Sequence, residues 1–167
     1  MHLYWQSLMM SLIAVLLIAT PFCHAQDASC KAVADAEVLV LRTPHHIVST
    51  EVQGGKSTIS EEISVTRGVF WGSNGVWHKA AASMQEFARD SADTIHELRD
   101  CHRNGDEGID GQPATKYAFH NHASGGDDTV WIAKGSGLVL KTEALIEDRH
   151  ISSRYDYSNI QAPTNVR

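Results

Sequence analysis

The sequence predicts an α+β domain in which an antiparallel sheet wraps around its helices. The prediction depends on three features: a helix-like apolar spacing over residues 28–41, two hairpin patterns after it, and a second helix-like segment followed by a series of short alternating runs. This order of helix, hairpins, helix and meander is typical of α+β domains.

Composition limits the function. The chain has 167 residues, of which 43% are hydrophobic, and 14 Lys and Arg stand against 20 Asp and Glu. A net charge of −6 argues against a nucleic-acid partner, since such proteins need basic surfaces. The length suits one domain, and we find no internal repeat or low-complexity tract. These features exclude multidomain enzymes, nucleic-acid readers and polytopic membrane proteins.

Residues 1–25 have the pattern of a cleaved signal peptide. Leu8 to Ala19 is apolar apart from Ser11, which suits a signal sequence better than a bilayer span. Cys23 and Ala25 are small residues at the −3 and −1 positions for cleavage after Ala25, and Phe22 directly before Cys23 argues against lipidation. We therefore expect a periplasmic or secreted protein consisting of residues 26–167, with an uncleaved anchor as the alternative.

Cleavage would leave two cysteines, Cys30 and Cys101. In an oxidising compartment they are expected to pair, closing a loop of about seventy residues worth ~4 kcal/mol. A redox pair or a metal site is the alternative, but the spacing matches neither motif. We predict a structural disulfide between the first helix and the end of the second.

The first helix is predicted over 28–41, ending before Pro44. Runs 45–53 and 56–66, joined by Gly54-Gly55, predict a hairpin. In the second run Ile59, Ile63 and Val65 share one face, which we expect to be the core face. Glu61 shares their parity, so it is either a buried functional carboxylate or is turned to solvent by a bulge.

A shorter hairpin is predicted from 68–71 and 76–79, joined by a turn at Asn74-Gly75. Ser83 and Glu86 have the spacing of a capping box, and the apolar spacing that follows predicts an amphipathic helix ending near Cys101. Beyond it, four runs separated by short turns predict an antiparallel meander: 114–122, 128–134, 138–147 and 150–160.

Three segments in the last third of the chain carry a resemblance to a known family. They are Trp131-Ile132, Gly137-Leu138-Val139-Leu140-Lys141 and Tyr155-Asp156-Tyr157-Ser158-Asn159. With an exported chain that opens on a helix and hairpins, they resemble the LolA-like superfamily of periplasmic lipoprotein carriers and lipid-binding relatives. The resemblance implies a curved antiparallel half-barrel around two main helices, whose concave side encloses an apolar cavity for acyl chains.

On this basis we expect a monomeric binding protein without a cofactor, not an enzyme, that holds a lipid acyl chain or another apolar small molecule and possibly an envelope lipoprotein. Large apolar side chains on the sheet and the second helix are the expected ligand contacts: Trp71, Trp77, Phe87, Ile95, Trp131, Leu140, Tyr155 and Tyr157. A filled core would instead indicate an envelope interaction protein that uses an exposed sheet edge.

An enzyme is the third hypothesis. His120 and His122 alternate along a predicted strand, so both imidazoles could bind one metal, with Asp127 or Asp128 as a further ligand. Because Tyr117 and Phe119 occupy the opposite, core-facing parity, a solvated strand face explains the two histidines better.

Overall fold

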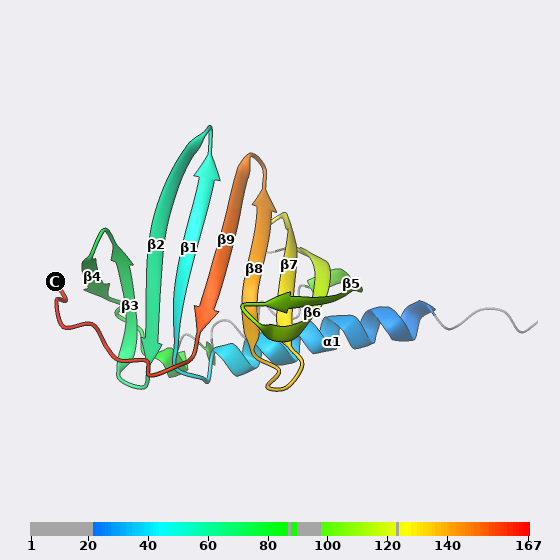
Figure 1. Ribbon diagram of the computed structural model, residues 1–167, viewed down its shortest axis with the longest axis horizontal. Coiled ribbons are helices and arrows are strands. Elements are labelled where there is room, and N and C mark those ends of the chain that lie inside the picture. Colours follow the sequence, from blue (N-terminus) through cyan, green and yellow to red (C-terminus); the bar gives the residue numbers. More distant parts are fainter. Residues whose placement is uncertain (1–21, 87, 90–97, 123) are drawn as a thin grey trace, which may run out of the picture.

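The computed structural model describes residues 22–86, 88–89, 98–122 and 124–167, and within them one long helix lies against a curved nine-stranded sheet (Figure 1). The helix, α1, spans Phe22–Val40. The strands are β1 (His45–Gln53), β2 (Lys56–Val65), β3 (Gly68–Ser73), β4 (Val76–Lys79), β5 (Leu98–Ile109), β6 (Gln112–Asn121), β7 (Gly126–Ala133), β8 (Val139–Ile146) and β9 (Arg149–Asp156).

The sheet is antiparallel and consists of two meanders, β1 to β4 and β5 to β9, in the order β4-β3-β2-β1-β9-β8-β7-β6-β5. The meanders join where β1 pairs with β9, with Ser49 opposite Ser153 and their hydroxyl oxygens 2.8 Å apart. The α+β class and the antiparallel sheet are confirmed. The second meander has five strands, one more than the sequence predicts.

The first helix covers residues 28–40 of the predicted range 28–41, but it begins six residues earlier, at Phe22. Its buried residues Val33, Ala36 and Val40 recur every three or four positions, so they form one apolar stripe. After Val40 the Thr43 hydroxyl donates to the Leu39 carbonyl at 2.7 Å, and Pro44 follows. Residues 1–21 lie outside the described residues, so cleavage of a signal peptide stays a prediction.

Two tight turns set the hairpin registers. Gly54 and Gly55 connect β1 to β2, and Asn74 and Gly75 connect β3 to β4, all four with positive φ. Two-residue turns with positive φ at both positions match the twist of paired strands, and glycine or asparagine adopts them at low cost. Both predicted hairpins are therefore confirmed.

The second helix begins as a capping box. The Glu86 carboxylate accepts from the Ser83 backbone N–H at 2.8 Å, and the Ser83 hydroxyl oxygen accepts from the Glu86 N–H at 3.2 Å. Residues 84–86 and 88–89 are helical, and the remainder of the predicted helix up to residue 97 lies outside the described residues.

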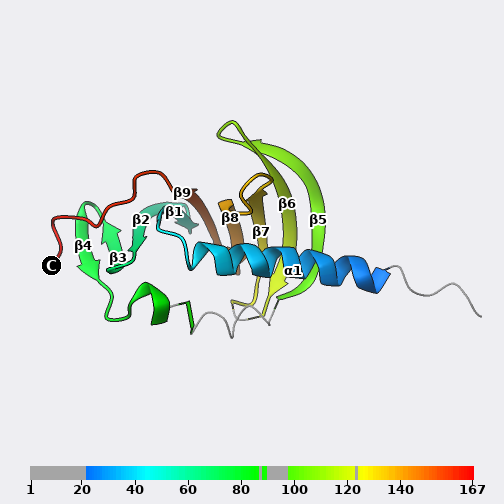
Figure 2. The ribbon, with the colours of Figure 1, turned by 90° about the horizontal axis from the view of Figure 1, so that it is seen from below.

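The sequence predicts that this helix ends near Cys101. That prediction is wrong, because Leu98 and Cys101 belong to the start of β5. Two register shifts, between Arg99 and His102 and between Arg103 and Asp106, insert extra residues into this strand. Because each bulge displaces the alternation, the buried positions Leu98, Cys101 and Ile109 are spaced like those of a helix. Bulges also bend a strand, and Figure 2 shows β5 and β6 curving around α1.

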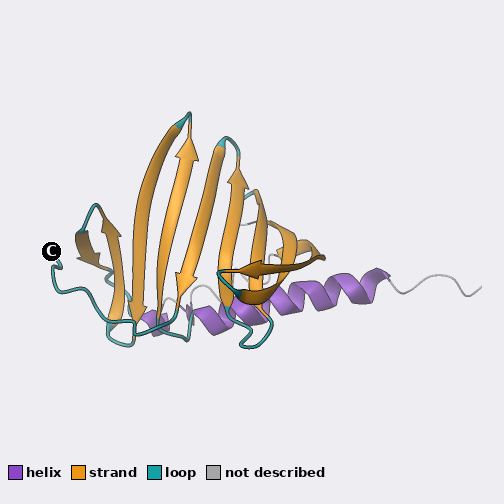
Figure 3. Ribbon diagram, in the orientation of Figure 1, coloured by secondary structure: helices purple, strands orange, loops and turns teal. Residues whose placement is uncertain are grey.

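The main core lies between α1 and strands β5 to β8. In the view coloured by secondary structure, α1 runs along one side of the sheet (Figure 3). A smaller cluster lies on the other face of β7, where Trp131 packs with Ile109 and Leu140. The Trp131 indole N–H donates to Glu107 at 2.8 Å and Arg154 pairs with Asp110, so the β5–β6 hairpin is held over this face.

The predicted core face of β2 is wrong at Ile59, whose side chain is 55% exposed, whereas Ser64 on the opposite face is 2% exposed. No bulge lies in the β1–β2 ladder, and Glu61 is half-buried on the same face as Ile59. The prediction fails because α1 packs mainly against β5 to β8 and not against β2. The side of β2 that carries Glu62 and Ser64 therefore borders a partly polar cavity, and the side that carries Ile59 is left uncovered at that residue.

Candidate ligand-binding site

A cavity of about 320 Å³ lies between the C-terminal half of α1 and the sheet. Its volume falls at the lower end of the range of about 300–1,000 Å³ typical of small-molecule sites. Its walls come from α1, the segment near residue 84 and strands on both sides of the β1–β9 junction. The lining residues are Glu37, Val40, Leu41, His45, Ile47, Glu62, Ser64, Val69, Met84, Asn121, Val130, Val139, Thr142 and Tyr155.

Half of the wall is apolar. It consists of branched aliphatic side chains from the helix and four strands together with one methionine: Val40, Leu41, Ile47, Val69, Met84, Val130 and Val139. A second hollow of about 710 Å³ adjoins the cavity and shares Leu41 and Met84 with it. Such a surface suits the hydrocarbon part of a ligand, since apolar area removed from water is favourable by about 25 cal/mol per Å².

The polar part of the wall has its centre at His45 and Glu62. His45 is only 3% exposed, and its Nδ1 lies 2.7 Å from the Thr43 carbonyl oxygen. Because a carbonyl only accepts, Nδ1 carries a proton. Glu62 Oε1 accepts from the Ser64 hydroxyl at 2.9 Å and lies 3.4 Å from His45 Nε2. The Ser64 hydroxyl and His45 Nε2 therefore both lie next to the same Glu62 oxygen, Oε1.

Glu37 brings a second carboxyl to the cavity from α1. Burial, reinforced by the nearby Asp128 carboxylate, raises the pKa of Glu37 from 4.5 to about 7. Burial also raises the pKa of Asp128, although Asn121 donates a hydrogen bond to it at 3.3 Å. The other Asp128 oxygen, Oδ1, is buried without a hydrogen-bond partner among the described residues.

One tyrosine lines the cavity, and a second lies beside it with ring centroids 6.5 Å apart. Tyr155 lines the cavity, and burial raises its pKa to about 12. Tyr157 packs against the main core, where its hydroxyl donates to the Val139 carbonyl at 2.6 Å, and burial raises its pKa as well. Both tyrosines therefore stay neutral hydrogen-bonding groups at any physiological pH.

The structure does not gather the eight predicted ligand contacts into one place. Tyr155 lines the cavity, and Tyr157 packs nearby in the core. Trp131 and Leu140 lie in the cluster on the other face of the sheet. Trp77 lies beside His46, with ring centroids 6.5 Å apart, on that other face too, and Trp71 is 43% exposed. Phe87 and Ile95 lie outside the described residues.

Sequence reasoning missed Glu37, His45, Glu62 and Ser64. Glu62 and Ser64 lie on the face of β2 where polar residues alternate along the strand, and such a face normally contacts solvent. The pair His45-His46 did carry a readable signal, since neighbouring strand residues face opposite ways. His45 faces the cavity and lies near Glu62, while His46 bonds Glu61 at 2.8 Å on the other face.

The histidines proposed for a metal lie on β6 and just beyond it. His120 Nδ1 lies 2.9 Å from Asp127 Oδ1, and the ring of His122 packs edge-on against that of His120, with centroids 4.9 Å apart. Asp128 belongs to the opposite face of β7 from Asp127 and bonds Asn121 instead. Within the described ranges, no group of three or more His, Cys, Asp or Glu side chains could hold a metal ion.

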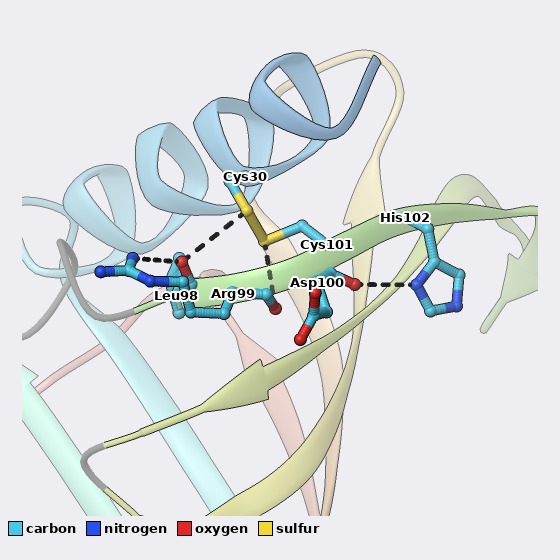
Figure 4. The surroundings of a disulfide bond; sticks show 6 residues. All are labelled: Cys30, Leu98, Arg99, Asp100, Cys101 and His102. Carbon is cyan, nitrogen blue, oxygen red and sulfur yellow. Dashed lines mark hydrogen bonds between the residues drawn. A yellow bond between two sulfur atoms is a disulfide. The ribbon is translucent and has the colours of Figure 1, made fainter. Parts of the chain in front are cut away.

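The predicted disulfide joins Cys30 to Cys101, with Cα atoms 5.1 Å apart. Figure 4 shows it between α1 and β5, beside Leu98. Cys101 is 2% exposed and belongs to the main core. The pairing is confirmed, although its second anchor is a strand and not a helix end.

By sequence, no protein-family model and no curated protein matches this chain. By structure, it is similar to the lipoprotein LppX of Mycobacterium tuberculosis, with a TM-score of 0.55 and 10% identity over 82% of this chain and 99% of LppX. LprF from Mycobacterium bovis matches with a TM-score of 0.54 and 6% identity, over 84% of this chain and 99% of LprF.

The Pseudomonas aeruginosa MucA/MucB complex contains a third similar chain, with a TM-score of 0.51 and 10% identity over 81% of this chain and 59% of that one. Each of these three matches covers more than 80% of this chain. The fold is LolA-like. In the described part of the chain, no helix has the length and apolar character needed to cross a membrane.

Proposed function

We propose that this chain is an exported envelope protein that shelters the apolar part of a small ligand, such as a lipid acyl chain, in the cavity between α1 and the sheet. The cavity of about 320 Å³, with its aliphatic wall, is the observation that carries the proposal. The signal-peptide pattern of residues 1–25 supports export to the periplasm or beyond. A binding role needs no chemistry from the wall, so we do not propose an enzyme.

A variant that fills the cavity tests this role. Ile47 lines the cavity from β1, whereas its neighbour Val48 is exposed on the other face of the same strand. We expect Ile47→Trp to weaken binding of the uncharged fluorescent probe N-phenyl-1-naphthylamine by at least about tenfold, because the indole occupies the ligand's space. Val48→Trp, the matched control, should bind like the unaltered protein.

Melting temperatures of both variants separate occlusion from misfolding, since overpacking a wall costs about 1–3 kcal/mol. Native mass spectrometry of the chain purified from a periplasm should also show a lipid adduct that Ile47→Trp lacks. Equal probe binding by the two folded variants, or neither adduct nor probe binding in the unaltered chain, would contradict the proposal.

An envelope protein partner is the second candidate. A chain of the MucA/MucB complex shares this fold, and that assembly pairs two proteins. If a partner binds the sheet and not the cavity, Val48→Trp should disturb its capture while Ile47→Trp should not. The same pair of variants therefore distinguishes the two candidates.

A further inference from the structure

The charged groups of the cavity wall are mostly acidic. Glu37 from α1 and Glu62 from β2 both line it, and no Lys or Arg is among its described lining residues. Its one basic group is His45, whose Nδ1 already bonds the Thr43 carbonyl and whose Nε2 faces Glu62. Above pH 7 the cavity therefore offers the Glu37 carboxylate to whatever enters it, whereas Glu62 has His45 beside it and Arg42 and Arg89 line the adjoining hollow.

Glu37 is a half-buried carboxyl without a charged or hydrogen-bonding partner in the described structure. Across the described ranges, it takes part in no ion pair and no side-chain hydrogen bond, whereas Glu62 is held by Ser64. Partial removal of a carboxylate from water without a partner costs free energy, so a glutamine at this position would stabilise the fold better. Groups kept in unfavourable surroundings inside a cleft are candidates for function.

A carboxyl near Glu37 has a buried oxygen without a partner in the described structure. Asp128, on the helix-facing side of β7, is close enough to Glu37 to act on its ionisation, and its Oδ1 is buried without a hydrogen bond in the described structure. Its Oδ2 is bonded to Asn121, which itself lines the cavity. An unmet hydrogen-bond acceptor therefore lies next to Asn121 of the wall, near the Glu37 carboxyl.

We propose that the ligand is a cationic amphiphile, whose protonated amine pairs with Glu37 near Glu62 while its hydrocarbon chain lies against Ile47, Val130 and Val139. This inference rests on the proposed function and names the ligand's chemical class. An ammonium group brings one positive charge and three N–H donors, so it complements unpaired carboxylates. A fatty acid of the same length would be repelled, which makes the wall selective.

The ionisation of Glu37 makes the proposal sensitive to pH. The titratable groups that face it from the packed strands are Asp128 on β7, His45 on β1, Glu62 on β2 and Tyr155 on β9. With a Glu37 pKa of about 7, the carboxyl is mostly neutral at pH 5.5 and mostly ionised at pH 8.5. A primary alkylamine stays protonated over this range, since such amines have pKa values of about 10.

Displacement of N-phenyl-1-naphthylamine by decylamine, decanol and decanoate at pH 5.5 and 8.5 tests the inference. At pH 8.5 we expect decylamine to bind at least about tenfold more tightly than decanol, and decanoate more weakly than both. Between pH 5.5 and 8.5 the affinity for decylamine should rise, by at most about thirtyfold if only ionised Glu37 binds it.

Glu37→Gln should remove both the preference for the amine and its pH dependence, while decanol still binds. Asp35→Asn is the control: it removes one negative charge from the same helix, at an exposed residue. If decylamine and decanol compete equally in the unaltered protein, or Glu37→Gln keeps the preference, this inference is wrong and the proposed function stands. If none of the three displaces the probe, the proposed function itself fails.

Discussion

Removing the Cys30–Cys101 disulfide should destabilise the fold by about 4 kcal/mol. The bond closes a loop with a sequence separation of 71, and constraining such a loop in the unfolded chain is worth about 4 kcal/mol in the chain-entropy treatment. For a domain of this size, that loss corresponds to a drop in melting temperature of roughly 10–15 °C.

The two cysteines differ in their surroundings, and this refines the expectation. Cys101 is 2% exposed in the core between α1 and β5, whereas Cys30 is only half-buried. Cys101→Ala should therefore cost about 1 kcal/mol more than Cys30→Ala, because it also leaves a small void. The double variant should match Cys101→Ala to within about 1 kcal/mol, since each substitution removes the same bond.

Urea unfolding and thermal melts of the three variants, with thiol titration of the unfolded and unreduced protein, provide the measurement. The unaltered protein treated with reductant should melt close to Cys30→Ala. Two free thiols in periplasm-derived protein, or single losses that add in the double variant, would refute the reasoning.

Three further outcomes are expected. Glu37→Gln should stabilise the fold above pH 7. In the folded protein the Glu37 carboxyl has a pKa of about 7, so it keeps a proton that the unfolded carboxyl, with a pKa of 4.5, releases. The free energy of unfolding of the unaltered protein therefore falls by about 3 kcal/mol as pH rises from 4.5 to 7. Urea unfolding at pH 4.5, 6 and 8 measures it, and an equal slope in Glu37→Gln would contradict it. Trp131→Phe removes the N–H that bonds Glu107, so it should cost about 1–2 kcal/mol and speed amide exchange in the β5–β6 hairpin, whereas unchanged exchange there would argue against this anchor. Ser83→Ala removes the hydroxyl of the capping box and should cost about 1 kcal/mol in urea unfolding, with Ser83→Asp as the variant expected to retain stability.

The accuracy of the sequence predictions followed the range of the interactions behind them. Gly54-Gly55 and Asn74-Gly75 mark hairpins because a turn depends on the φ angles of two residues. The capping box at Ser83 is equally local, since its partner is three residues away. The fifth strand of the second meander was missed because the bulges of β5 are created by pairing with β6, and the residues of β5 alone show a helical spacing.

The candidate site was harder to predict than the fold. Choosing large aromatic residues placed Tyr155 in the cavity but sent Trp131 to the other face of the sheet, because an aromatic side chain is equally suited to either side. Glu62 and Ser64 belong to a polar strand parity that resembles a solvated face. Only the position of α1 shows that this parity borders a cavity.

The sequence by itself determined most but not all elements of this protein: the first helix, the hairpin turns, the capping box, the antiparallel class and the pairing of its last two cysteines. These depend on backbone preferences over a few residues or on simple counting. Only the tertiary structure decided that β1 pairs with β9, which face of β2 is covered, and that Glu37 meets Glu62 across a cavity. Those features arise when segments from about 25 to about a hundred residues apart bury surface together, and a strand carries no mark of the neighbour that will cover it.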